Sequence, residues 1–327
     1  MIQQHRGGAQ RGCWLGRLAA AVFLIVGFSS CTVARVDHAE NLKETVRLVA
    51  EVKAFGKTLG IEPTEALSRT TEERPPLSML WLWMQRVGTL ALDAPIDIRT
   101  AIGFSVVKEH LKLEQVYRVD GYSVYYRQGN EFADSRSVAT SGFAGEDIAQ
   151  QVKVILHEDL HDDKNFNLTW EVEESIVTPL GSLAAAEFFK RTGDQESLQR
   201  MLAAIEDERR YGRELNALVG AVQQLFRTVT PEQAQEQILN LIPRYPVYHL
   251  KFEQQIEGQH PATVLEAKLS HDLAYYRYFD QIIALAETVA DLKKLIDDLK
   301  KLPSDTRQNG LEAYLAHLKH QYSQSTN

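Results

Sequence analysis

The sequence predicts a mainly α protein with a small β-hairpin or sheet. Apolar residues recur at helical spacing near the start of the chain and through almost all of it after Glu146. Residues 114–127 depart from this pattern, because β-branched and aromatic side chains surround a tight-turn dipeptide. The chain has 327 residues, and we expect a single mainly helical domain over residues 31–327.

The first thirty residues have the three regions of a bacterial lipoprotein signal peptide. Three arginines make a basic start, and residues 18–28 form an apolar run that is too short to span a bilayer. Small residues then directly precede Cys31, as they do at a lipidation site. We therefore predict a signal peptide over residues 1–30 and a lipid on Cys31. An uncleaved anchor and ordinary secretion are the alternatives.

The cysteines and the net charge limit the cell compartments and the classes of partner that fit this sequence. The chain has two cysteines, and removal of the signal peptide would take Cys13 with it, so that no disulfide could form. Thr32 follows the lipidated position and favours the outer membrane over the inner one. We expect a protein of the bacterial cell envelope, anchored to the membrane by its lipid and facing the periplasm. The formal net charge of -8 does not suit nucleic-acid binding.

Between the leader and residue 146, apolar spacing and turn residues divide the chain into five segments. The first apolar pattern is followed by Gly60, which can end a helix. Asp120-Gly121 is a turn dipeptide inside the β-branched region. The expected elements are a helix over His38–Leu59, a loop over Ser68–Pro76, a buried helix over Met79–Leu92, a β-hairpin over Glu114–Arg127 and a surface loop over Gln128–Gly145.

The remainder of the chain is predicted to be almost entirely helical, with one part over residues 145–190 and a C-terminal part over residues 196–327. Pro179 and Gly181 are expected to kink or interrupt the second helix of this series. The predicted helices are Asp147–Asp162, Trp170–Arg191, Glu196–Thr228, Pro231–Ile242, Pro261–Leu302 and Gly310–Gln321.

One short motif carries chemistry. His157-Glu158-Asp159-Leu160-His161 fits H-E-x-x-H, and on a helix its two histidines lie one turn apart on the same face. Two imidazoles placed in this way can bind one zinc ion, and Glu158 can take a proton from water beside it. Zinc hydrolases of this class need a third protein ligand, and the next helix offers Glu171, Glu173 and Glu174. The simpler interpretation is two solvated histidines on an acidic helix.

The spacing after the motif resembles that of a family of bacterial zinc aminopeptidases, lipoproteins of the glutamate-zincin group. Twelve residues separate His161 from Glu174-Ser175, and Thr178 and Gly181 then complete the family's T-x-x-G pattern. The tyrosine-rich stretch Gly121–Tyr126 is also similar to a strand of that family. The resemblance implies a zincin-like helical metallopeptidase domain with Zn²⁺ bound by His157, His161 and Glu174. It also implies that Glu158 is the general base.

The chain departs from the family pattern through acidic residues beside the motif. Carboxylates near a bound zinc ion would raise the basicity of the imidazoles and change the charge of the site. These acidic residues are Asp159, Asp162, Asp163 and Glu173.

Two functions are consistent with this pattern. The first is a membrane-anchored zinc peptidase acting on a peptide or protein substrate. An aminopeptidase would need a carboxylate such as Glu173 or Asp159 to hold the substrate's α-amine, and an endopeptidase fits equally well. The second is a non-catalytic lipoprotein scaffold with a degenerate zincin site. The candidates for binding substrate or stabilising the oxyanion are Tyr125 and Tyr126, with Tyr248, His249 and His271 as further donors.

Overall fold

The computed structural model describes residues 38–71, 79–92, 97–103, 120–128, 137–161, 163, 166, 168–256 and 258–325. All of them belong to one compact unit, Asp37–Asn327. The predicted signal peptide and Cys31 lie outside the described residues. Within the described part of the chain, no helix is both long enough and apolar enough to cross a membrane.

The prediction of a mainly α protein with a small sheet is confirmed. The helices are α1 (His38–Thr58), α4 (Ser141–Ala144), α5 (Ile148–His161), α6 (Trp170–Thr192), α7 (Gln195–Phe226), α8 (Pro231–Leu241), a 3-10 turn (Ile242–Arg244), α9 (Pro246–Gln255), α10 (Pro261–Tyr276), α11 (Phe279–Val289), α12 (Leu292–Leu299) and α13 (Gln308–Ser325). The strands are β1 (Thr70–Thr71), β2 (Met79–Arg86), β3 (Ile98–Gly103), β4 (Tyr122–Gln128) and β5 (Ala139–Thr140).

The main sheet has the order β3-β2-β4, and both of its strand pairs are antiparallel. The prediction of a buried helix over Met79–Leu92 is therefore wrong, because Met79–Arg86 is the central strand. Leu82, Trp83 and Met84 are all buried, so both faces of this strand are covered. A strand covered on both faces has no alternating pattern, and its continuous apolar run cannot be told from a buried helix by periodicity.

The predicted hairpin is confirmed only for its second arm. β4 begins directly after Gly121, whose φ of +83° supplies the left-handed turn, but its partner in the sheet is β2. Residues 114–119, the predicted first arm, lie outside the described residues. The predicted surface loop Gln128–Gly145 is wrong in part, because it contains β5 and α4, and Phe143 is fully buried. β5 pairs in parallel with β1, inside the predicted loop Ser68–Pro76.

The C-terminal helices follow the predicted pattern with three differences. α6 continues through Pro179 and Gly181 without interruption. The predicted helix Pro261–Leu302 is three helices, α10, α11 and α12, and Ala290 ends α11 in the left-handed conformation at φ +55°. α9 was not predicted at all.

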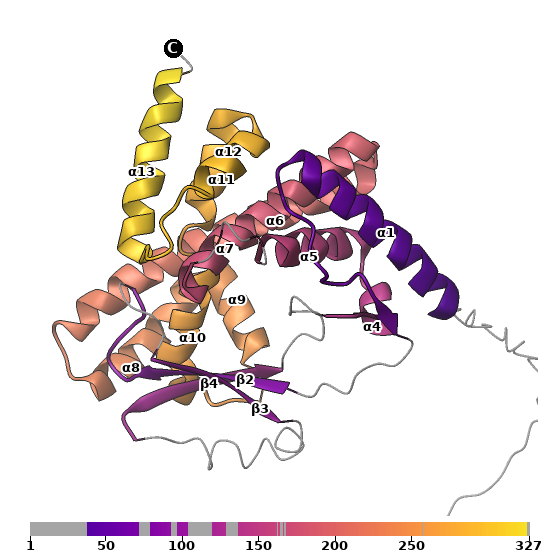
Figure 1. Ribbon diagram of the computed structural model, residues 1–327. Helices are drawn as coiled ribbons and strands as arrows, with labels where there is room; N and C mark the ends of the chain where they lie inside the picture. Colours follow the sequence, from indigo (N-terminus) through magenta and orange to yellow (C-terminus); the bar gives the residue numbers. More distant parts are fainter. Residues whose placement is uncertain are drawn as a thin grey trace, which may run out of the picture. The chain divides into compact units, whose positions relative to one another are not determined.

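The helices that carry the motif lie above the main sheet, and α10 packs between the sheet and α6 (Figure 1). The hydroxyl of Ser175 on α6 donates to the main-chain oxygen of Ala274 on α10 over 2.7 Å. One apolar cluster is formed by side chains of α1, α5, α6 and α11 to α13. A second cluster lies between the sheet, α10 and α7. Trp170, at the start of α6, packs against the second cluster, so α6 connects the two.

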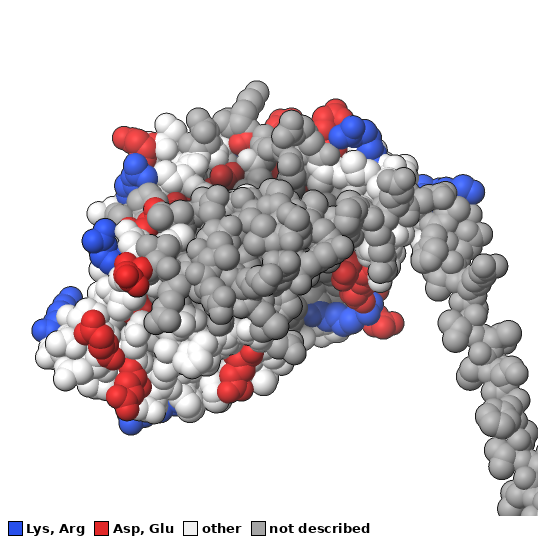
Figure 2. All heavy atoms as spheres, turned by 90° about the horizontal axis from the view of Figure 1, so that it is seen from below, with Lys and Arg blue, Asp and Glu red and all other residues white. Residues whose placement is uncertain are grey.

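Charged side chains of both signs are interspersed on the surface. On the face shown in Figure 2, the Lys and Arg side chains of the described residues are scattered among Asp and Glu side chains. Elsewhere in the described residues, ion pairs join helices, as Arg209 of α7 does with Asp280 and Glu287 of α11, at 2.7 Å each.

Candidate metal centre

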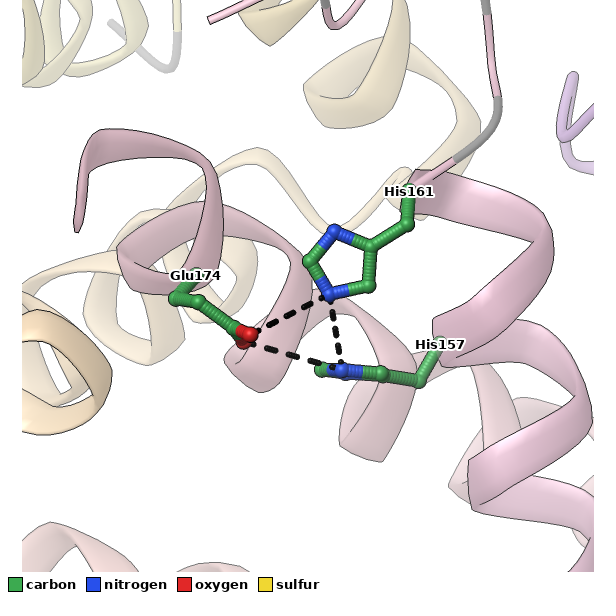
Figure 3. Close-up of side chains that lie close together, drawn as sticks. All are labelled: His157, His161 and Glu174. Carbon is green, nitrogen blue, oxygen red and sulfur yellow. Dashed lines mark hydrogen bonds and ion pairs between the residues drawn. The ribbon is translucent and has the colours of Figure 1, made fainter. Parts of the chain in front are cut away.

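His157, His161 and Glu174 come together at the contact of α5 and α6. Figure 3 shows the three side chains pointing toward one another, two from α5 and one from α6. The Nε2 atoms of His157 and His161 are 3.0 Å apart. Glu174 Oε2 lies 3.6 Å from His157 Nε2, and Glu174 Oε1 lies 3.4 Å from His161 Nε2. Of the three carboxylates that the sequence offered, Glu174 is the one that faces both rings.

These separations fit a metal ion bound by all three side chains. Four-coordinate zinc holds nitrogen and oxygen ligands at about 2.0–2.1 Å, which places neighbouring ligand atoms about 3.3 Å apart. The three observed separations, from 3.0 to 3.6 Å, lie on both sides of that value. The histidine side chains are 17% and 21% exposed, so both rings are partly accessible to solvent.

The local fold explains why the two helices approach so closely. The face of α5 opposite the histidines is buried through apolar residues such as Val152, Ile155 and Leu156. On α6, a Cβ atom added to Gly181 would lie only 3.1 Å from the Cβ of His157. Glycine at this position lets α6 lie against the His157 backbone, which brings Glu174, two turns earlier, within reach of both rings.

Each ligand side chain has a second hydrogen-bond partner that fixes its orientation. The Trp170 indole Nε1 donates to Glu174 Oε1 over 3.1 Å, and the Thr178 hydroxyl donates to Glu174 Oε2 over 3.3 Å. Glu173 Oε1 lies 3.2 Å from His161 Nδ1. The main chain of Val177 hydrogen-bonds His157. Carboxylate or carbonyl partners on the far nitrogens of histidines are typical of metal sites, because they fix the ring and its tautomer.

The electrostatics of the trio favour one positive charge at its centre. Burial raises the pKa of Glu174, but the charge and hydrogen bond of His161 bring it down to about 2. Burial lowers the pKa of His161, and Glu174 and Glu173 more than reverse this, so that it stands well above its usual value. Burial and the neighbouring His161 lower the pKa of His157 to about 3. The site therefore holds an ionised Glu174, a neutral His157 and a protonated His161. A metal cation could take the place of the proton on His161, because both carry positive charge between the same groups.

The acidic neighbours of the motif do not all face the trio. Asp159 is buried on the other side of α5, where it pairs with Lys53 of α1 and accepts from the main chain and hydroxyl of Thr64. Asp163 pairs with Lys300 in the same manner. Asp162 lies outside the described residues. Asp159 therefore joins α5 to α1, and the hypothesis that it holds a substrate amine is wrong.

Glu158 lies beside the ligands, as the motif requires. Its side chain is largely buried, and its charge raises the pKa of His161, which places the two groups near each other. The structure thus brings the predicted general base and the three predicted ligands into one region. A carboxylate at this position can exchange a proton with a group held by the ligand trio.

The five candidate donors have contacts of their own. Tyr125 is buried and stacks on Trp83 at 5.7 Å, and the main chain of Tyr126 bonds the Gln259 side chain through both its N–H and its oxygen. The remaining three pair with acidic residues: Tyr248 donates to Asp272 Oδ2 over 3.1 Å, His249 lies 3.1 Å from Glu253, and His271 lies 3.0 Å from Asp272. Their roles toward a substrate stay predictions.

Sequence reasoning missed Trp170 and the supporting role of Glu173. Trp170 lies four residues before Glu174, so helical spacing alone places both on one face. Glu173 was counted as a departure from the family pattern, whereas it bonds the far nitrogen of His161.

Comparison of the chain with protein-family models, with curated proteins and with solved structures found no significant match. The site is therefore interpreted from its own geometry, and the resemblance to zinc aminopeptidases stays a prediction.

Proposed function

We propose that this protein is a zinc-dependent peptidase whose metal is held by His157, His161 and Glu174. The observation that supports it most is the convergence of the two histidine Nε2 atoms, 3.0 Å apart, with the Glu174 carboxylate, which has one oxygen within 3.6 Å of each ring nitrogen at the α5–α6 contact. Two imidazoles and one carboxylate suit zinc better than magnesium or calcium, which prefer ligand sets made of oxygen. The motif and the third ligand, which would leave one position on the zinc open, match hydrolytic rather than structural zinc sites.

The chain's own residues supply the remaining chemistry. When bound, zinc supplies Lewis acidity, which makes water in the open position acidic enough to lose a proton near neutral pH. Glu158 would take that proton and return it to the amine that leaves after a peptide bond is cleaved. Trp170 and Thr178 keep the Glu174 oxygens directed at the centre, and Glu173 holds the His161 ring. The helix itself holds Glu158 next to His157.

The predicted location belongs to the same proposal. A signal peptide over residues 1–30 and a lipid on Cys31 would place the peptidase at the bacterial outer membrane, facing the periplasm. The lipid would be its membrane partner, and peptides or proteins of the envelope would be its substrates. The charge of the chain makes nucleic acid an unsuitable partner.

The Glu158→Gln variant tests the proposed function. We expect the purified variant to bind one zinc ion like the unaltered protein, because Glu158 is not a ligand. Its rate of peptide hydrolysis should fall about 100- to 10,000-fold, the usual contribution of a general base. Zinc content is measured by elemental analysis and hydrolysis with a library of quenched peptides. Glu146→Gln, at an exposed position just before α5, is the matched control and should change neither quantity.

The scaffold alternative makes the opposite prediction. If the unaltered, zinc-loaded protein and Glu158→Gln have equal rates, the peptidase proposal fails. His157→Ala separates the metal from the reaction, because it should lose both zinc and hydrolysis. A His157→Ala protein that keeps its zinc would show that the metal is bound elsewhere.

A further inference from the structure

A group of buried nitrogen atoms without hydrogen-bond partners lies near the metal centre. Among the described residues, five buried side-chain polar atoms lack a partner. Three of them, Trp83 Nε1, Arg127 Nε and His271 Nε2, belong to one cluster. Folded proteins rarely leave buried polar atoms unpaired, so a group of them calls for an explanation, and a bound molecule that supplies the missing partners is one. We call these three residues the donor cluster.

The donor cluster is built on the main sheet and α10. Trp83 lies at its middle, with the His271 ring 4.5 Å from its own ring and the Arg127 Cζ 5.8 Å from it. Tyr125, which pairs with Trp83 across the two strands, packs beside them with its ring 5.2 Å from the His271 ring. Arg127 follows Tyr125 by two residues, so both side chains lie on the same face of β4.

The cluster has an excess of positive charge. Arg127 makes no ion pair with any described residue. Burial is the main reason that the pKa values of His271 and Lys268 are lowered, and the charge of Arg127 adds to both shifts. Lys268 and Asp272, both buried, neutralise each other. An arginine whose Nε–H is buried without an acceptor favours an anion, and a carboxylate is the anion that its planar group binds best.

His271 complements these donors with an acceptor. Its Nδ1 lies 3.0 Å from Asp272 Oδ1, and the pKa of Asp272 is lowered to about 2, against the effect of burial, by Lys268 and His271. An ionised carboxylate can only accept, so Nδ1 carries the hydrogen and Nε2 presents its lone pair. Tyr211 and Tyr248 also donate to Asp272 and fix its position.

The Trp170 side chain links this cluster to the proposed zinc ligands. The Trp170 ring lies 6.4 Å from Trp83 and 6.5 Å from His271, and its Nε1 donates to Glu174. An extended peptide advances about 3.4 Å per residue, so the cluster lies within a few residues of the metal centre.

We propose that the donor cluster binds the C-terminal residue of a peptide substrate, with its carboxylate on Arg127 and Trp83 and its N–H on His271. A C-terminal residue offers one carboxylate and one neighbouring N–H, which matches two donors and one acceptor. This inference rests on the proposed peptidase function and names its substrate class, short peptides or chain ends with a free carboxylate. The acidic residues expected to hold an α-amine, Glu173 and Asp159, are instead bound to His161 and Lys53.

The test compares the peptide Ala-Ala-Phe with its C-terminal amide. Binding to the metal-free protein is measured by calorimetry and hydrolysis by the zinc-loaded protein is measured separately. We expect the free acid to bind about tenfold or more tightly than the amide, because only the acid carries the charge that Arg127 pairs with. Arg127→Met should remove this preference without weakening amide binding. Trp83→Phe keeps the ring stack and should reduce the preference, which tests the same claim should Arg127→Met fail to fold.

Arg86→Met is the matched control. Arg86 also lies over an aromatic ring of this sheet, 5.6 Å from the centre of Tyr122, but at an exposed position. Its replacement should leave the preference for the free acid intact. Equal binding of the two peptides by the unaltered protein overturns the inference, as does a preference that survives both Arg127→Met and Trp83→Phe. Tighter binding of the acid without hydrolysis of either peptide would support the donor cluster, while the peptidase is decided separately by the Glu158→Gln comparison.

Discussion

At the scale of single residues, the candidate metal centre depends on partners outside its three proposed ligands. His161 is held between Glu174 on one ring nitrogen and Glu173 on the other, at 3.4 and 3.2 Å. A carboxylate on the far nitrogen keeps the ring in one tautomer and makes the near nitrogen a stronger ligand. Glu173 therefore belongs to the candidate metal centre even though it is not one of the three proposed ligands.

We predict that Glu173→Ala will weaken zinc binding about 10- to 100-fold, the usual loss when such a partner is removed. Competition with a chromogenic chelator measures the dissociation constant. Glu173→Gln keeps an acceptor but no charge, so its zinc affinity should lie between those of the unaltered protein and Glu173→Ala. Glu187→Ala on the partly exposed side of α6 is the control. An unchanged zinc affinity in Glu173→Ala would contradict the role given to this residue.

Much of this centre could be predicted from the sequence, because its residues lie close together along the chain. His157 and His161 are one helical turn apart, and the twelve-residue spacing selected Glu174 from three glutamates. The direction of Asp159 could not be predicted, since it depends on Lys53, 106 residues earlier in the chain. The donor cluster was also out of reach, because its three residues come from two strands and a helix.

At the scale of elements, α1 is joined to the ligand helix by a buried ion pair. Lys53 of α1 bonds Asp159 of α5, and the two side chains are 10% and 1% exposed. Burial raises the pKa of Asp159 more than the bonds from Lys53 and Thr64 lower it. The pair is therefore costly to bury, and the loss of one partner would leave an uncompensated charge in the protein interior.

We predict that Lys53→Met will lower the free energy of unfolding by about 3–5 kcal/mol, the usual cost of removing one partner of a buried pair. Lys53→Met combined with Asp159→Asn should recover most of this loss, because asparagine is neutral and still accepts from Thr64. Urea unfolding measures both. Lys57→Met at an exposed position of α1 should cost little. If the double variant is no more stable than Lys53→Met, the buried charge is not the cause.

Elements were predicted well where the apolar pattern has a clear helical period, and poorly where a strand is buried on both faces. α5 and α8 have amphipathic patterns, and their predicted bounds agree with the structure to within one residue. β2 is buried on both faces and was taken for a helix. The long pattern over Pro261–Leu302 concealed two breaks, because neither Arg277 nor Ala290 is a residue that usually marks the end of a helix.

At the scale of the whole molecule, two apolar clusters meet at α6 and α10, and Tyr276 packs against both. His271 of α10 is buried in this region, and burial lowers its pKa to about 4 despite the bond to Asp272. In the unfolded chain the same imidazole would titrate near 6.5. Between these two pH values, His271 is therefore neutral in the folded protein and protonated in the unfolded chain.

We predict that the stability of the metal-free protein will fall as the pH is lowered from about 6.5 to 4. His271 should contribute about 1.4 kcal/mol per pH unit to this fall, because only the unfolded chain binds its proton in that range. Above pH 6.5 both states are neutral and the contribution vanishes. Denaturant unfolding at several pH values should give a shallower slope for His271→Gln than for the exposed control His317→Gln. Equal slopes would contradict the prediction.

The hydrogen bond from Trp170 to Glu174 has a practical consequence. An indole whose N–H donates to a carboxylate senses the charge on that carboxylate, and any cation that binds Glu174 changes this charge. The fluorescence emission of Trp170 should therefore shift when a metal ion enters the site. If the site takes up an ion, the tryptophan emission of the protein would follow its loading and removal in real time, without a substrate or an added dye.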